Sequence, residues 1–241
     1  MASTTETGHA KNIANLKKLN EINGGFGATY NPSNGLLIQA TMVGQWTNSD
    51  GLQGAVNTQR GVFEPFQNAR VTEFEPVKKL VRRVRSAAKV CGAEDGFYID
   101  VNKWVVKILG ERISAATPTP EDPSGTSASQ QSYDNTVNNF GSLVGILAGE
   151  PLYAPNEADL QVASLTLKHT KLDTTNNKVK QNVVPFNNAV IARNKALYKE
   201  TIGLCDVGQA SKNYVRSVYG FSSAEFKLVS GIKFTKLAKI I

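Results

Sequence analysis

Short segments of the first half of the chain recur, in the same order, in the second half. The clearest pair is PFQNA, which begins at Pro65, and PFNNA, which begins at Pro185. The other pairs are YNPSNGLL at 30 with YAPNEADL at 153, VRS at 84 with VRS at 215, and VCGAED at 90 with VYGFSS at 218. Because ordered self-similarity indicates a repeated architecture, the pattern predicts that the chain contains two copies of one unit.

The spacing of apolar residues predicts that both copies are helical. Apolar residues recur at every third position from Ile13 to Ile22, and the same spacing returns from Val137 to Ile146. Residues with this spacing lie on one face of a helix. The two segments also align with each other, which adds a fifth match to the ordered series.

Further helices are predicted between and after these short ones. A long helix is expected to start near Asn34, and shorter ones are expected over 77–90 and 97–109. A corresponding long helix is expected after Pro155. Pro65 is predicted to kink or restart the first long helix, because proline removes a backbone hydrogen bond from a helix interior.

These elements predict an all-α fold, an elongated helical bundle of two tandem four-helix repeats with pseudo-twofold symmetry. The first repeat is expected over 1–112 and the second over 132–241, and the two could pack as one domain. The Pro-, Ser- and Thr-rich stretch 113–131 has no hydrophobic periodicity and is predicted to be a linker. The long helices are expected to be central, since two copies of one unit usually pack as the subunits of a symmetric dimer do.

Four stretches resemble a family of uncharacterised helical Bacteroidota proteins with no known activity. They are MASTTETGHAKN at 1–12, YNPS at 30–33, LYAPNEADL at 152–160 and NNAVIARNKALY at 187–198. The resemblance implies a bacterial, helical and non-catalytic protein. It implies no cofactor and no catalytic residue.

The residue types that carry most enzyme chemistry are sparse. His9 and His169 each stand alone in the sequence, whereas a catalytic base needs an oriented partner. Cys91 and Cys205 lie in apolar surroundings, which is typical of buried free thiols. The sequence contains no HExxH, CxxC or GxSxG pattern and no complete dinucleotide-binding glycine motif. It therefore predicts that the protein is not an enzyme and has no metal site or cofactor.

One segment concentrates positive charge. Six bases and no acid occur within 77–90, namely Lys78, Lys79, Arg82, Arg83, Arg85 and Lys89. A helix that carries these residues could contact the phosphates of nucleic acid. The other interpretation is a solvated or ion-paired face of an amphipathic helix. We favour the second, because the matching segment of the other repeat keeps only Lys212 and Arg216.

The end of the chain alternates lysines with apolar residues. The apolar ones are Ile232, Phe234, Leu237, Ile240 and Ile241. They are predicted to pack on the body of the protein, on a neighbouring copy or on an anionic surface. An apolar ending of this kind favours a segment that is held in place.

The leading functional hypothesis is a non-catalytic structural or self-assembling scaffold, with the protein itself as partner in a homo-oligomer or assembly. The alternative is a nucleic-acid-binding protein that uses the helix 77–90. A net charge of +7 would also suit an acidic protein surface. The sequence has no apolar run near the roughly 18 residues that cross a bilayer and no recognisable secretory signal. We therefore expect a cytoplasmic protein.

Overall fold

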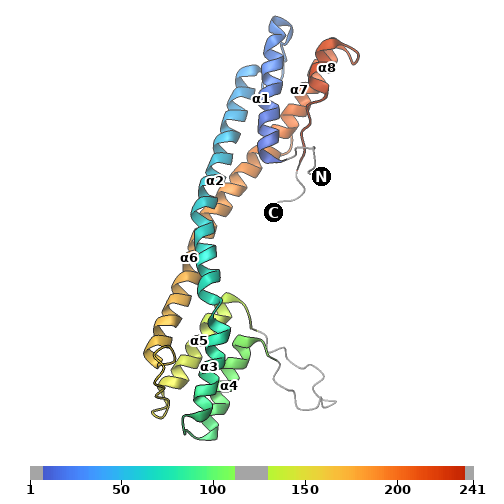
Figure 1. Ribbon diagram of the computed structural model, residues 1–241. Helices are drawn as coiled ribbons and strands as arrows, with labels where there is room; N and C mark the ends of the chain where they lie inside the picture. The colour runs from blue at the N-terminus through green and yellow to red at the C-terminus, as the bar shows by residue number, and fades with distance from the viewer. Residues whose placement is uncertain (1–7, 112–129, 237–241) are drawn as a thin grey trace, which may run out of the picture. The chain divides into compact units, whose positions relative to one another are not determined.

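The computed structural model describes residues 8–111 and 130–236, and every regular element in these ranges is a helix (Figure 1). The first half forms α1 (His9–Gly25), the short 3-10 helix η1 (Gly27–Thr29), α2 (Gln39–Phe74), α3 (Val77–Val90) and α4 (Asp95–Leu109). The second half forms α5 (Tyr133–Ala148), α6 (Val162–Tyr198), α7 (Leu204–Tyr219) and α8 (Ala224–Ser230). The prediction of an all-α fold is confirmed.

The helix boundaries differ from the predicted ones at two places. The first long helix starts at Gln39 rather than near Asn34, because the residues before it form a turn. The helix also does not restart at Pro65: α2 continues through this residue, as α6 continues through Pro185. Each long helix therefore continues past its proline although proline removes one backbone hydrogen bond. The predicted linker 113–131 lies outside the described residues, apart from Gln130 and Gln131.

The chain divides into two compact units. Unit 1 comprises Met1–Val62 and Val183–Ile241, and unit 2 comprises Phe63–Asn182. Each unit therefore takes segments from both halves of the sequence, and each takes part of both long helices. The predicted tandem repeats 1–112 and 132–241 do not coincide with these units.

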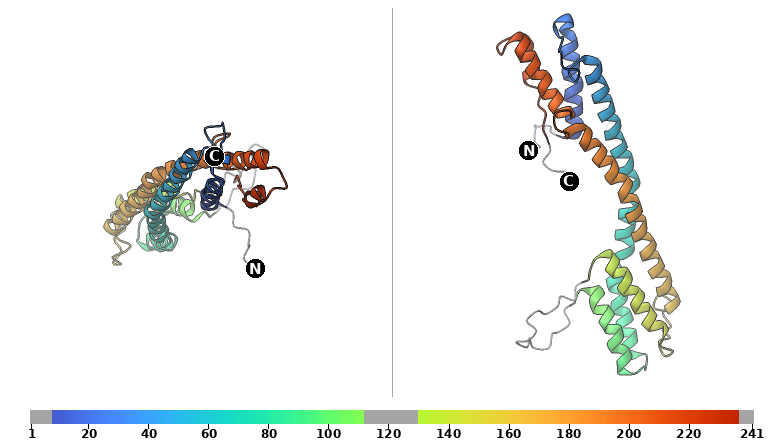
Figure 2. Two further views of the ribbon diagram at one scale, coloured as in Figure 1. Left: turned by 90° about the horizontal axis from the view of Figure 1, so that it is seen from above. Right: turned by 180° about the vertical axis from the view of Figure 1, so that it is seen from behind.

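Unit 1 has its core between α1, α7, α8 and the adjoining ends of the long helices (Figure 2). Of the apolar residues predicted on one face of α1, Ile13, Leu16 and Leu19 are buried there, and Ile22 is half-buried against the same core. The buried apolar side chains include Ile13, Leu16, Leu19, Met42, Leu197, Leu204, Val215 and Val229. Burial of such side chains is the main favourable contribution to folding.

Unit 2 has a separate core formed by α3, α4, α5 and the first part of α6 (Figure 1). Ser132 caps α5, where its hydroxyl accepts a hydrogen bond of 3.1 Å from the backbone nitrogen of Asn135. This cap satisfies one of the free N–H groups at the start of the helix. The buried apolar side chains include Val77, Val81, Val84, Val101, Val105, Phe140, Leu143, Leu147, Leu165 and Leu172.

The segment 231–236 has no regular structure, but side chains of α1 and α7 bind its backbone. The Asn12 amide donates to the Thr235 carbonyl (2.8 Å) and accepts from the Thr235 nitrogen (3.0 Å). The ammonium group of Lys212 donates to the carbonyl of Ile232 at 2.6 Å. Ile232 is buried and Phe234 half-buried, so the predicted packing is confirmed for these two residues. Leu237, Ile240 and Ile241 lie outside the described residues.

His9 makes unit 1 sensitive to pH. Its Nδ1 atom lies 2.7 Å from the Tyr198 hydroxyl. Burial, with a smaller contribution from Arg193, lowers the pKa of His9 below its ordinary value of 6.5. Folding thus favours the neutral imidazole, and this contribution to stability is present above the unfolded pKa and lost as the pH falls through it toward the folded pKa.

We therefore expect His9→Asn to flatten the pH dependence of stability. The urea midpoint of the wild-type protein should fall between about pH 7.5 and pH 5.5, and it should fall less in the variant. His169→Asn serves as the control for a histidine outside this contact. Parallel pH profiles for wild type and His9→Asn would contradict the assignment.

Candidate functional site

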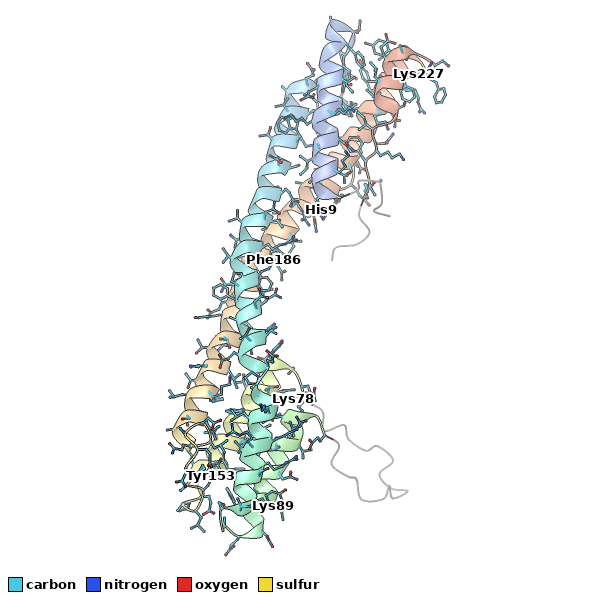
Figure 3. All side chains as sticks on the ribbon, in the orientation of Figure 1. His9, Lys78, Lys89, Tyr153, Phe186 and Lys227 are labelled. Atoms are coloured by element: carbon cyan, nitrogen blue, oxygen red, sulfur yellow. The ribbon has the colours of Figure 1, made fainter. Side chains whose placement is uncertain are left out.

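The six bases predicted as an anion-binding surface all lie on α3 in unit 2, where Figure 3 labels Lys78 and Lys89. Three of them have polar partners. Arg83 forms a bidentate ion pair with Asp159. The Arg85 guanidinium lies 2.9 Å from the Glu111 carboxylate, and the Lys78 ammonium group donates to Gln131 at 3.1 Å. The hydrogen bond between Arg83 and Asp159 raises the pKa of the arginine and lowers that of the carboxyl group.

The other three bases, Lys79, Arg82 and Lys89, are exposed. Their side chains form no ion pair with a residue in 8–111 or 130–236. The six bases thus do not form one continuous free stripe. This arrangement favours the ion-paired interpretation of α3 over a nucleic-acid interface.

The distribution of charge between the two units also favours the ion-paired interpretation of α3. Within the described residues, unit 1 has 12 Lys and Arg against 5 Asp and Glu, an excess of 7, whereas unit 2 has 13 against 12, an excess of 1. The basic helix therefore lies in the nearly neutral unit. Binding to nucleic acid through α3 stays a prediction, and the unit that contains α3 has no large excess of positive charge to support it.

A pocket of about 760 Å³ opens beside α3, between this helix and the turn 152–160. We call it the α3 pocket. Arg82 and Glu157 contribute charged groups to its lining, and Ala87, Val90, Leu152 and Leu160 contribute apolar ones. Such a mixture can hold an apolar group and orient it by charge.

Tyr153 lines the same pocket and forms a hydrogen bond across the turn 152–160. Its hydroxyl donates to the Leu160 carbonyl at 3.1 Å, and its ring is 6.3 Å from that of Phe97. Burial raises the pKa of Tyr153 to about 12. The phenol therefore stays protonated near neutral pH and acts as a structural donor rather than as a base.

A second pocket of about 560 Å³ lies on the other side of Arg83, between α3 and α6. Its charged groups are also largely paired. The Lys168 ammonium group is 2.6 Å from the Glu73 carboxylate and donates to the Glu73 carbonyl at 2.7 Å. Lys171 and Lys79 complete the basic lining. Two ion pairs thus use four of the charged groups in the lining, and the ammonium groups of Lys79 and Lys171 form no ion pair with a described residue.

The histidines and cysteines have structural surroundings. The His169 ring packs so closely over Gly141 that a Cβ atom there would lie 2.8 Å from its Nε2 atom. Cys205 is buried, and burial raises the pKa of its thiol to about 12. Both cysteines are free thiols, but only Cys205 is buried as predicted, whereas Cys91 is half-buried. Among the described residues, no three potential metal-ligating side chains come together.

Sequence reasoning missed the α3 pocket. It treated YAPNEADL as a repeat match and did not identify a surface beside it. Ala87 on α3 contributes a small side chain to the lining of the pocket. Small side chains on a helix leave room beside it, but only the fold shows what lies opposite.

Comparison of the chain with protein-family models, curated proteins and solved structures found no match. The resemblance to Bacteroidota proteins therefore stays a prediction. Within the ranges that the structure describes, none of the helices has the length and hydropathy required to span a membrane.

Proposed function

We propose that the protein is a non-catalytic, self-assembling helical scaffold that arose by internal duplication. The main support is that a similar hydrogen-bonded turn precedes each of the two long helices. The Tyr30 hydroxyl donates to the Leu37 carbonyl at 2.8 Å, and the Tyr153 hydroxyl donates to the Leu160 carbonyl at 3.1 Å. The two tyrosines are 123 positions apart, and so are the two leucines.

The long helices show the same offset of 123 positions between the two halves, which we call the 123-residue register. On α2, every seventh residue from Met42 to Phe63 is buried, and on α6 every seventh residue from Leu165 to Val179 is buried. Burial at seven-residue intervals is typical of a coiled-coil seam. Matching positions of the two series are again 123 apart: Met42, Ser49 and Val56 correspond to Leu165, Leu172 and Val179.

A pair of arginine contacts gives further support. In unit 1, Arg193 Nη1 donates to Gln53 Oε1 at 3.4 Å. In unit 2, Arg70 Nη1 donates to Asn176 Oδ1 at 3.2 Å. The two arginines are 123 positions apart, as are the two amide residues. In the proposed duplication, each half therefore supplies the arginine of one unit and the amide residue of the other unit.

This register changes the meaning of the two pentapeptides. PFQNA and PFNNA are 120 positions apart, three fewer than the buried residues of the long helices. In the proposed alignment Phe186 corresponds to Phe63 rather than to Phe66. Pro65 and Pro185 then do not mark the same point of two related helices.

Exposed apolar side chains near the turns favour assembly. Val90 is the last residue of α3 and Ile99 lies on α4, while Phe221 lies in the turn between α7 and α8 and Leu228 lies on α8. Exposed apolar groups that cluster on a soluble protein often mark sites of association. The buried side chains of Asn12 and Lys212 form internal hydrogen bonds.

Self-assembly is tested by the size of the protein in solution. Multi-angle light scattering over a wide concentration range should show a mass that exceeds one chain and rises with concentration. Electron microscopy should show assemblies at the high end of that range. A monodisperse monomer at high concentration, with no assemblies in micrographs, would overturn the proposal.

The equivalence of the two turns predicts similar costs for the loss of either tyrosine hydroxyl. Tyr30→Phe and Tyr153→Phe should each lower the free energy of unfolding by about 1–2 kcal/mol, because a buried carbonyl loses its donor. Chemical denaturation checks this. Tyr98→Phe is the control, since the Tyr98 hydroxyl has no hydrogen bond with a described residue. An effect at only one of the two turns would contradict the equivalence.

A further inference from the structure

The two units differ in what lies between a helix and the neighbouring tyrosine turn. In unit 1, α7 packs aromatic rings there. The Tyr214 ring is 5.3 Å from the Tyr30 ring, edge to face, and its hydroxyl accepts a hydrogen bond of 3.2 Å from the Asn31 nitrogen. The Tyr219 ring is 5.3 Å from that of Phe26. This space in unit 1 is thus occupied by aromatic side chains of the chain itself.

In unit 2, the helix at the corresponding place is α3, which has no aromatic residue. Its side chains toward the turn 152–160 include Ser86, Ala87 and Val90, and the α3 pocket remains open there. The walls of this pocket are mainly apolar, so filling it with an apolar group would be favourable. The arrangement in unit 1 indicates that an aromatic ring suits this kind of space.

The chain itself carries a suitable ring. Phe221 is 74% exposed and is the one exposed aromatic side chain within 8–111 and 130–236. It lies in the turn between α7 and α8, directly after Gly220, whose φ of 90° favours glycine. Among the residues that the structure describes, its ring contacts one other aromatic ring, that of Phe226, at a centroid distance of 5.6 Å. Phe221 is therefore presented to the solvent.

We propose that the α3 pocket of one copy receives Phe221 of a second copy, so that copies join head to tail. Charges near the two surfaces are complementary. Glu225 and Lys227 follow Phe221 on α8, where Lys227 is labelled in Figure 3, and the α3 pocket carries Arg82 and Glu157. Opposite charges across an interface help to set its orientation.

This interface would be heterologous, because it joins two different surfaces of the same chain. Each docked copy then still has one unused pocket or one unused Phe221. Such contacts repeat until they close into a ring or extend into an open chain. The inference rests on the self-assembly proposed above and names the contact that produces it.

Two variants test the two sides of the contact. Phe221→Ser removes the ring, and Ala87→Trp fills the pocket. Loss of a central aromatic anchor should weaken association by at least about thirtyfold, because such residues dominate interface energies. Arg82→Glu is a second pocket variant at an exposed position, where substitution leaves the fold largely unaffected. Leu167→Ser is the matched control at an exposed site away from the contact.

A mixing experiment then gives a sharper result. Phe221→Ser and Ala87→Trp proteins should each be monomeric at concentrations at which the wild type assembles. Each pair of these variants retains one intact pocket and one intact Phe221, so their mixture should form dimers and nothing larger. Light scattering or analytical ultracentrifugation distinguishes dimers from longer assemblies.

Exchanging the charges of Arg82 and Glu225 tests whether assembly can be restored. Arg82→Glu should weaken assembly, and adding Glu225→Arg in the same chain should restore part of it. If the wild type assembles, and Phe221→Ser and Ala87→Trp assemble equally well, the Phe221 contact is wrong while the scaffold proposal stands. A mixture that forms no dimers, from folded variants, also overturns the contact. A wild-type protein that stays monomeric overturns both.

Discussion

Leu143→Ala is expected to lower the free energy of unfolding by about 3–4 kcal/mol, because it leaves a cavity in the core of unit 2. Leu143 lies on α5 with 0% of its surface exposed, among apolar side chains of α3, α4 and α6. The expected loss is a large fraction of the total stability of a typical domain. Urea denaturation followed by circular dichroism measures it.

The same substitution at an exposed site is the matched control. Leu167 lies on α6 in unit 2 and is 65% exposed. Leu167→Ala should change the free energy of unfolding by no more than about 0.5 kcal/mol, as is usual for surface positions. Similar losses for the two variants would show that α5 does not pack as described.

Lys212→Met is expected to release the segment 231–236 and to lower the free energy of unfolding by about 2–3 kcal/mol. The Lys212 side chain is buried and donates to two backbone carbonyls, those of Ser230 (2.9 Å) and Ile232 (2.6 Å). Burial lowers the pKa of this lysine. Methionine fills similar space but leaves both carbonyls without a donor, which is costly in a buried setting.

Hydrogen exchange locates this effect. The backbone amides of 231–236 should exchange faster in Lys212→Met, whereas those of α5 should be unchanged. Lys227→Met is the control, because Lys227 is exposed on α8. Unchanged exchange in 231–236 would contradict the anchoring role of Lys212.

Helix positions were largely predictable from the sequence, and α3 matches its predicted range of 77–90. Its apolar residues recur at intervals that only a helix can place on one face, and Pro76 stands just before its start. The predicted restart of the helix at Pro65 was wrong, because α2 continues through this residue. A proline removes one hydrogen bond, and the remaining bonds and packing of a 36-residue helix outweigh that loss.

The candidate site was less predictable. The six bases of α3 were identified, but their pairing was not, because Arg83 and Asp159 are 76 positions apart. The seven-residue spacing from Met42 to Phe63 was present in the sequence and was missed among the glycines of α2. The α3 pocket had no sequence signal of its own, since its walls come from a helix and a distant turn.

The sequence by itself determined that this protein is helical, where most of its helices lie, and that the residue types of common catalytic centres are sparse. These properties depend on local spacing and on composition. Only the tertiary structure decided that each compact unit combines both halves of the chain, that Arg83 and Arg85 are paired, and that Phe221 is exposed while Tyr214 packs inward. The physical reason is that burial and ion pairing depend on which distant segments meet.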